Sequence, residues 1–167
     1  MDNENFEKQI RKRMNELEKI NAYGVFKELK GKITGFDYDT KSLTMTYEAT
    51  KFHENAFGIM FGGSIVGMFD ITFGTLTAGL GDYSVAPTVQ LSTTFLKGIP
   101  TGAIVRIEAE AVSAGKTIMN FVGKAYVEQE LMATASGTFM TPKPFKKLKK
   151  FLSKKFSACS LFVNRHY

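Results

Sequence analysis

The chain has 167 residues, of which 44% are hydrophobic and 23% charged, with a formal net charge of +6. These values are those of an ordinary globular protein and indicate one domain rather than several. The single cysteine, Cys159, excludes an internal disulfide. No basic segment followed by an apolar stretch opens the chain, so we expect a reducing, cytoplasmic setting.

The first predicted element is a helix over residues 4–21. Its apolar residues step by fours and threes and are Phe6, Ile10, Met14, Leu17 and Ile20. This spacing is typical of an amphipathic helix that packs on another element. Residues 32–36 and 42–47 then alternate in polarity and are rich in β-formers, which predicts a hairpin with its turn at 37–41.

The run from Gly62 to Gly79 is apolar or small on every face, which predicts a buried helix. The wider stretch 56–81 would be long enough for a membrane span, but a central Asp70 with several threonines and glycines disfavours that interpretation. Burying an ionised carboxylate without partners is costly. Asp70 is therefore either satisfied by a neighbouring hydroxyl, such as that of Thr72 or Thr75, or retained for chemistry.

Four further strands are expected at 86–97, 103–113, 116–128 and 131–140. In 103–111 apolar and mostly polar residues alternate, as on a strand with one buried face. The connections at 97–102, 113–115 and 128–130 look too short for crossovers, so we expect hairpins and a largely antiparallel sheet. A long buried helix with such a sheet wrapped around it is an α+β arrangement.

A spaced motif crosses the loop before the buried helix. Its residues are His53, Asn55, Gly58, Gly62, Gly63, Asp70 and Gly74. The pattern is similar to H-x-N-x-x-G-x-x-H-G-G followed by D-x-x-x-G, and it resembles that of hotdog-fold acyl-CoA thioesterases of the phenylacetate-pathway type. The resemblance covers about residues 42–140. It departs at one position, where Phe61 replaces the second histidine of the pattern.

The resemblance implies roles for several residues. Asp70 would be the general base or nucleophile, Asn55 would orient the water or the substrate carbonyl, and Thr88 would aid positioning. Backbone N–H groups at Gly62, with Gly63 beside it, would stabilise the thioester oxygen. Chemistry agrees, because hydrolysis needs a base near neutral pH, desolvation should raise the pKa of Asp70, and a glycine-rich helix start offers unobstructed donors.

Most of these residues also have a plainer interpretation. Asn55 is a common turn residue, Thr88 is a common strand-former, and a glycine pair also serves close packing. Gly63, Phe61 and His53 are the candidates for substrate binding, although His53 is more typical of a structural residue. Phe61 keeps the backbone donors but loses a side-chain donor.

We therefore expect an acyl-CoA thioesterase without metal or redox cofactor, since no Cys and His cluster has metal-ligand spacing. The resemblance implies a homodimer or homotetramer, because the aspartate and the glycine pair come from opposite subunits in that family. A non-catalytic acyl-CoA-binding module is the alternative. A hotdog dehydratase or hydratase is disfavoured because the Asp and His pair of those enzymes is not apparent.

The expected organisation is a helix over 1–22, a hotdog domain over 23–141 and a basic tail over 142–167. From Lys143 to Arg165 there are eight basic residues and no acidic ones, so the remainder has a net charge of −2. The tail has the spacing of a basic amphipathic helix. Anionic membrane lipid, coenzyme A phosphates, a neighbouring subunit or solvent could surround it; nucleic acid is disfavoured.

Overall fold

The computed structural model describes residues 2–21, 24–81 and 86–141. The predicted basic tail, 142–167, lies outside the described residues. The helices and strands, in chain order, are α1 (Asn3–Ile20), α2 (Gly24–Leu29), β1 (Lys32–Asp37), β2 (Ser42–Glu48), the short 3-10 helix η1 (Lys51–His53), α3 (Gly62–Gly81), β3 (Thr88–Phe95), β4 (Ile104–Ala114), β5 (Ile118–Val127) and β6 (Glu130–Met140).

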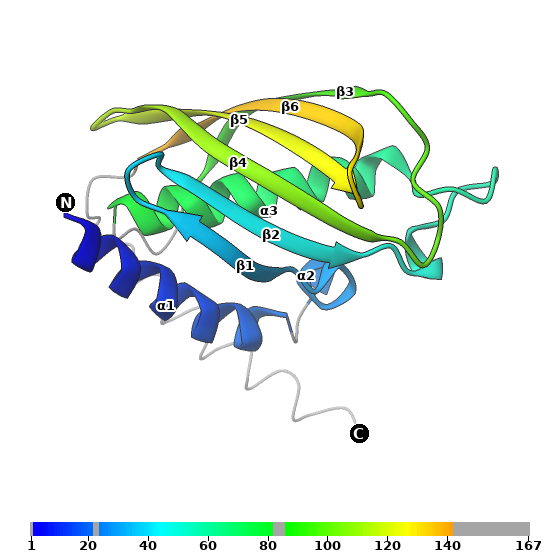
Figure 1. Cartoon of the computed structure of the whole chain (residues 1–167), viewed down its shortest axis with the longest axis horizontal. Helices are drawn as coiled ribbons and strands as arrows, with labels where there is room; N and C mark the ends of the chain where they lie inside the picture. The colour runs from blue at the N-terminus through cyan, green and yellow to red at the C-terminus, as the bar shows by residue number, and fades with distance from the viewer. Residues whose placement is uncertain (1, 22–23, 82–85, 142–167) are drawn as a thin grey trace, which may run out of the picture.

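One six-stranded sheet has the order β1-β2-β4-β5-β6-β3, and every neighbouring pair is antiparallel. The sheet curves over α3, and α1 and α2 lie beside it (Figure 1). This arrangement confirms the predicted α+β hotdog fold with a long central helix. The expected alternation also holds, because Val105 and Ile107 of β4 are fully buried.

Aromatic rings join α3 to the sheet. Phe73 stacks on Phe121 of β5, with ring centroids 5.5 Å apart, and meets Phe139 of β6 edge-on at 6.1 Å. Glycines make room for that ring, since a Cβ at Gly123 or at Gly137 would come within 2.8 Å of Phe73. By length and composition α3 could cross a membrane, but 61% of its apolar window is buried inside the fold, as in a core helix.

The helix α1 confirms the first predicted element, but its buried face differs from the expected one. Phe6 and Ile10 are fully buried, whereas Met14 is 39% exposed and the polar Gln9 and Arg13 are buried in its place. Each step of four residues turns the side chain by about 40° around the helix axis. Two such steps from Phe6 therefore turn the Met14 side chain away from the buried face of α1. Arg13 follows Ile10 by three residues, which turns its side chain back toward that face.

Two features of the connections differ from expectation. The helix α2 was not predicted, and the segment 97–102 is not a hairpin turn, because β3 pairs with β6 and not with β4. About three strand spacings of roughly 4.8 Å separate β3 from β4, a span that eight extended residues exceed. The connection is held against the loop before α3, where the Met60 N–H donates to the Ile99 carbonyl at 2.8 Å.

Candidate active site

Asp70 and Thr88 come together in the fold. The Thr88 hydroxyl, at the start of β3, donates to Asp70 Oδ1 on α3 at 2.5 Å. Thr72 and Thr75, the partners nearer in sequence, donate instead to backbone carbonyls four residues earlier, at 2.8 and 2.7 Å. The structure therefore gives Asp70 a partner from another element, and this hydrogen bond fixes the orientation of its carboxylate.

Asp70 is half-buried in the single chain, whereas the sequence predicted full burial. It opens onto a cavity of about 190 Å³ whose walls are mostly apolar. The cavity lies between α3 and the pair α1 and α2, and Phe139 of β6 also lines it. A half-exposed carboxylate beside an apolar hollow is an arrangement in which a base can meet both water and a bound apolar group.

The start of α3 presents the expected backbone donors. The N–H groups of Gly62 and Gly63 meet no backbone acceptor among the described residues, because the first turn of a helix has no intrahelical partners. Aromatic rings cover both glycines: a Cβ at Gly63 would lie 2.3 Å from the Phe61 ring, and one at Gly62 would lie 3.1 Å from Phe95. The pair therefore serves packing as well as leaving two donors for an anion.

Within one chain, the base and the donors are far apart. Asp70 follows Gly62 by eight residues on the same helix, which places them about 12 Å apart along its axis. A thioester carbonyl that accepts hydrogen bonds at the helix start cannot also lie against Asp70 of that chain. A site that uses both groups needs a second chain.

Asn55 shapes the loop before α3. Its side-chain oxygen accepts from the N–H groups of Phe57 at 2.9 Å and Ile59 at 3.5 Å. The turn that these bonds close includes Gly58, whose φ of +76° favours glycine. In the single chain the side-chain oxygen of Asn55 therefore has the contacts of a turn residue, and its role toward the water or the substrate carbonyl stays a prediction. Its amide nitrogen donates to no group in the described part of the chain.

His53 is a buried structural residue in this chain. It is 2% exposed, its Nδ1 accepts from the Thr50 N–H at 3.1 Å, and its carbonyl accepts from the Phe61 N–H at 2.6 Å. Burial lowers the pKa of His53, and the nearby Glu28 carboxylate opposes this shift. The imidazole is therefore neutral and helps to anchor the loop that leads into α3, and its expected role in substrate binding stays a prediction.

The lowered pKa of His53 predicts acid sensitivity of the fold. Between the lowered pKa and the ordinary value of about 6.5, the unfolded chain binds more protons than the folded one. Stability should be complete above that window and decline as pH falls through it, by at most about 1.4 kcal/mol per pH unit from this group. Urea unfolding of wild type and His53→Gln at several pH values measures this loss of stability. Equal acid sensitivity in both would contradict the assignment.

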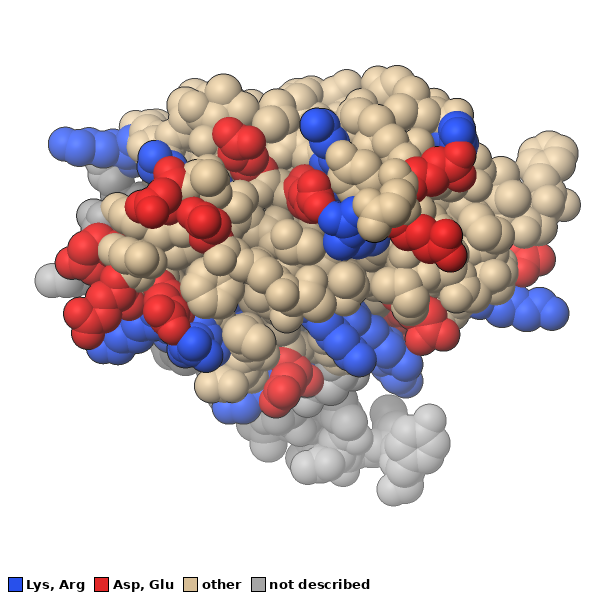
Figure 2. Space-filling model, in the orientation of Figure 1, with Lys and Arg blue, Asp and Glu red and all other residues tan. Residues whose placement is uncertain are grey.

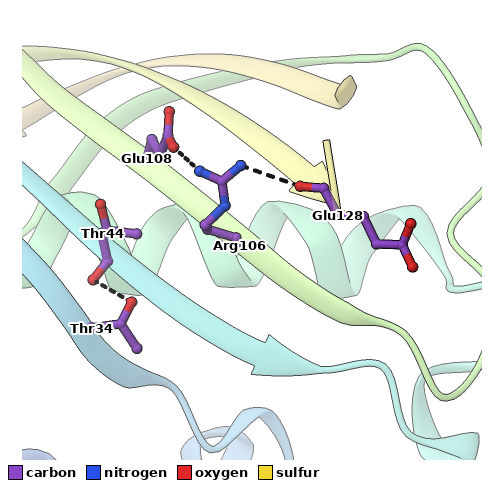
Figure 3. Close-up of polar contacts among 5 residues, drawn as sticks. All are labelled: Thr34, Thr44, Arg106, Glu108 and Glu128. Carbon is purple, nitrogen blue, oxygen red and sulfur yellow. Dashed lines mark hydrogen bonds and ion pairs between the residues drawn. The ribbon is translucent and has the colours of Figure 1, made fainter. Parts of the chain in front are cut away.

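Other polar groups gather on the open face of the sheet. Arg106 forms an ion pair with Glu108, donates to the Glu128 carbonyl at 3.3 Å (Figure 3) and lies 4.7 Å from the centre of the Tyr126 ring. Positive and negative groups are mixed over this face (Figure 2). Its hollow, about 620 Å³ and bordered by short polar side chains such as Thr44, is larger than the one at Asp70, and Asp70 does not line it. We interpret this face as a solvated surface network.

Sequence reasoning missed the contribution of α1. Arg13, Glu16 and Leu17 line the cavity beside Asp70, yet nothing in their spacing points to a site. Arginine is rarely buried without a reason, but the burial of Arg13, which forms an ion pair with Glu16, is seen only in the structure. Among the described residues, no group of three or more His, Cys, Asp or Glu side chains could hold a metal ion.

Comparison with known proteins identifies the family. A phenylacetic acid degradation-related protein of Ralstonia eutropha JMP134 has 32% identity and a TM-score of 0.65, with 70% of this chain and 89% of that chain covered. The family model described as the thioesterase superfamily matches residues 57–134. The chain belongs to the thioesterase superfamily. The matched range includes Gly62, Gly63, Asp70 and Thr88 but not α1.

More distant relatives share the thioesterase fold. The Escherichia coli PaaI protein from the phenylacetic acid degradation operon has 19% identity and a TM-score of 0.64, with 70% and 83% of the two chains covered. A Streptococcus mutans UA159 protein, solved with acetyl-CoA bound, has 24% identity and a TM-score of 0.60, with 66% and 88% covered. No curated protein sequence matches the chain significantly.

Proposed function

We propose that the protein hydrolyses an acyl-CoA thioester to a free acid and coenzyme A. The observation that carries this proposal is the Asp70 carboxylate, held by Thr88 at 2.5 Å beside an apolar cavity in a thioesterase-superfamily fold. Asp70 either takes a proton from the attacking water or attacks the carbonyl itself. In the first route the C–S bond breaks after the water oxygen has bonded to the carbonyl carbon, and the leaving thiolate takes up the proton that Asp70 removed. In the second route the C–S bond breaks as Asp70 forms a mixed anhydride, and water then hydrolyses this anhydride to the free acid and the Asp70 carboxylate, with the thiolate taking up a proton from that water.

Coenzyme A as the thiol carrier is supported by fold analogy. The Streptococcus mutans protein was solved with acetyl-CoA, and a Streptococcus pneumoniae TIGR4 protein of 21% identity was solved with coenzyme A. Their likeness to this chain concerns the fold, so the carrier remains part of the proposal. We also place the enzyme in the cytoplasm, where acyl-CoA is available and a single cysteine stays reduced.

We further propose that the active form is a homodimer, alone or paired into a tetramer. Among the described strands, β3 lies at an edge of the sheet with β6 as its one neighbour. Three apolar residues at the ends of β3 are half exposed or more: Val89 at 57%, Phe95 at 51% and Leu96 at 50%. A long edge strand with exposed apolar side chains and no protective charge invites pairing with another strand. A second copy placed there lies next to Thr88, the residue that holds Asp70.

A non-catalytic acyl-CoA-binding module is the second candidate, and Phe61 is the observation that favours it. Its ring is 58% exposed at the start of α3 and offers no hydrogen-bond donor where the family pattern has histidine. Such a module would bind acyl-CoA without releasing thiol. An assay of thiol release over a panel of acyl-CoAs, alongside binding of the same compounds, separates the two candidates.

Phe61→His should raise turnover several-fold if a missing donor limits an otherwise competent site. The expected gain lies below the roughly 10²-fold typical of one oxyanion donor, because the backbone N–H groups are already present. Phe61→Leu is the matched control, since it removes the ring from Gly63 without adding a donor. An equal gain in both variants would assign the effect to the space above Gly63. Unchanged turnover with tight binding in all three proteins would favour the binding module.

A further inference from the structure

The cavity beside Asp70 is bounded by elements from distant parts of the chain. Asp70, Gly74 and Ala78 of α3 lie along one wall, on successive turns. Leu17 of α1 and Phe26 of α2 line it as well, and Phe139 of β6 completes it. The volume is about 190 Å³. The hollow therefore extends from the carboxylate along α3, between the sheet and the two N-terminal helices.

Close contacts hold α1 and α2 over the two ends of α3. A Cβ at Gly79 would lie 2.4 Å from Ile10 of α1, and one at Gly67 would lie 3.3 Å from Leu29 of α2. At Gly74, between these contacts, a Cβ would meet only Phe139, at 3.6 Å, among the described residues. The helices α1 and α2 therefore contact α3 near its two ends and leave space over its middle.

The lining presents little that a polar group could bind. The Thr75 hydroxyl already donates to the Ile71 carbonyl at 2.7 Å, so Thr75 contributes its methyl group. The remaining charged groups are Asp70 and the Arg13–Glu16 ion pair, in which each charge has a partner. An occupant of the cavity is therefore an uncharged, apolar group.

We propose that this cavity receives the acyl group of the substrate and that Leu17 and Gly74 set its size limit. The proposal rests on the proposed function, because Asp70 at the cavity mouth is the proposed base. An apolar cavity of about 150 Å³ takes up benzene, so about 190 Å³ admits a phenyl ring with one or two further carbons, or a chain of up to about eight carbons. The helix α1 lies outside the family match at 57–134, so the role of Leu17 is inferred from the cavity of this chain and not from that match.

The test measures binding and hydrolysis against acyl length. S-alkyl-CoA thioethers of about two to sixteen carbons, which cannot be hydrolysed, report affinity by calorimetry, and the matching acyl-CoAs report kcat/KM. Affinity should rise up to about fourfold per methylene while the group enters the cavity, then stop rising near eight carbons. Leu17→Ala should move this limit longer by about two carbons. Gly74→Val should move it shorter by a similar amount, since φ at Gly74 is not positive and the space is open.

Ile10→Ala is the matched control. It removes a buried aliphatic side chain from the same face of α1 but from a residue that does not line the cavity. General loosening of α1 would change the length limit in Ile10→Ala as in Leu17→Ala. The inference requires a changed limit in Leu17→Ala and an unchanged limit in Ile10→Ala, with circular dichroism showing that all variants are folded.

The two proposals fail in different ways. An unchanged length limit in both Leu17→Ala and Gly74→Val, or wild-type affinity that keeps rising to sixteen carbons, overturns the cavity assignment even where thioesters are hydrolysed. A limit that moves as expected while no acyl-CoA releases thiol supports the cavity and overturns the proposed function. Failure of the wild type to bind any thioether overturns both.

Discussion

Replacing Asp70 by asparagine is expected to lower kcat by about 10²-fold or more while leaving substrate affinity nearly unchanged. The amide has the same shape and can still accept the Thr88 hydrogen bond, but it cannot take a proton from water or act as a carboxylate nucleophile. The loss of a positioned general base typically lies between about 10² and 10⁴. Thiol release from saturating acyl-CoA, together with thioether affinity, separates turnover from binding.

Thr88 supplies the graded control for Asp70. Thr88→Val removes the hydroxyl that fixes the carboxylate and keeps the branched shape suited to β3, so it should lower kcat less than Asp70→Asn does. Thr88→Ser retains the hydroxyl and should restore most of the rate. Full turnover in Asp70→Asn would remove Asp70 from the mechanism, whatever Thr88 does.

Much of the fold was predictable because its signals are local. The apolar run around Asp70 and the alternation in β4 depend only on residues within one element, and the structure confirms both. Strand pairing is not local. β3 is next to β4 in sequence, yet it lies at the edge of the sheet and pairs with β6, and no pattern within either strand indicates this long-range pairing.

The candidate site, like the fold, was only partly predictable from the sequence. The motif singled out Asp70, and the structure places a hydroxyl of the following strand against it, while the catalytic role of Asp70 stays a prediction. The same motif also contains Asn55 and His53, whose side chains make hydrogen bonds within the loop before α3. A spacing pattern records that residues are needed, but it does not distinguish groups that hold a loop from groups that react. The role of α1 could not be predicted in the same way, because it depends on which face of the helix packs on α3. The sequence pattern places Met14 on that face, whereas the structure buries the neighbouring Arg13.

The expectation of a shared active site can be tested at the helix start. Gly62 is the first residue of α3, a position where proline is accommodated because its missing N–H has no helical partner. Gly62→Pro therefore deletes one proposed oxyanion donor, and kcat should fall about 10²-fold to 10³-fold. Gly62→Ala adds the same Cβ beside Phe95 but keeps the N–H, so it should lose far less.

Co-expression of Asp70→Asn with Gly62→Pro should then restore activity that neither variant has alone. Because about 12 Å of helix separates the two groups in one chain, each site is expected to combine Asp70 of one subunit with Gly62 of its partner. In a mixed dimer one of the two sites carries both defects and the other carries none. Random pairing makes about half of the dimers mixed, so activity should return to roughly a quarter of wild type.

Tagging each variant differently and purifying through both tags isolates the mixed dimer, whose activity should approach half of the wild-type activity. Activity no higher than the mean of the two variants would show that each chain contains a complete site, and the dimeric mechanism would have to be abandoned.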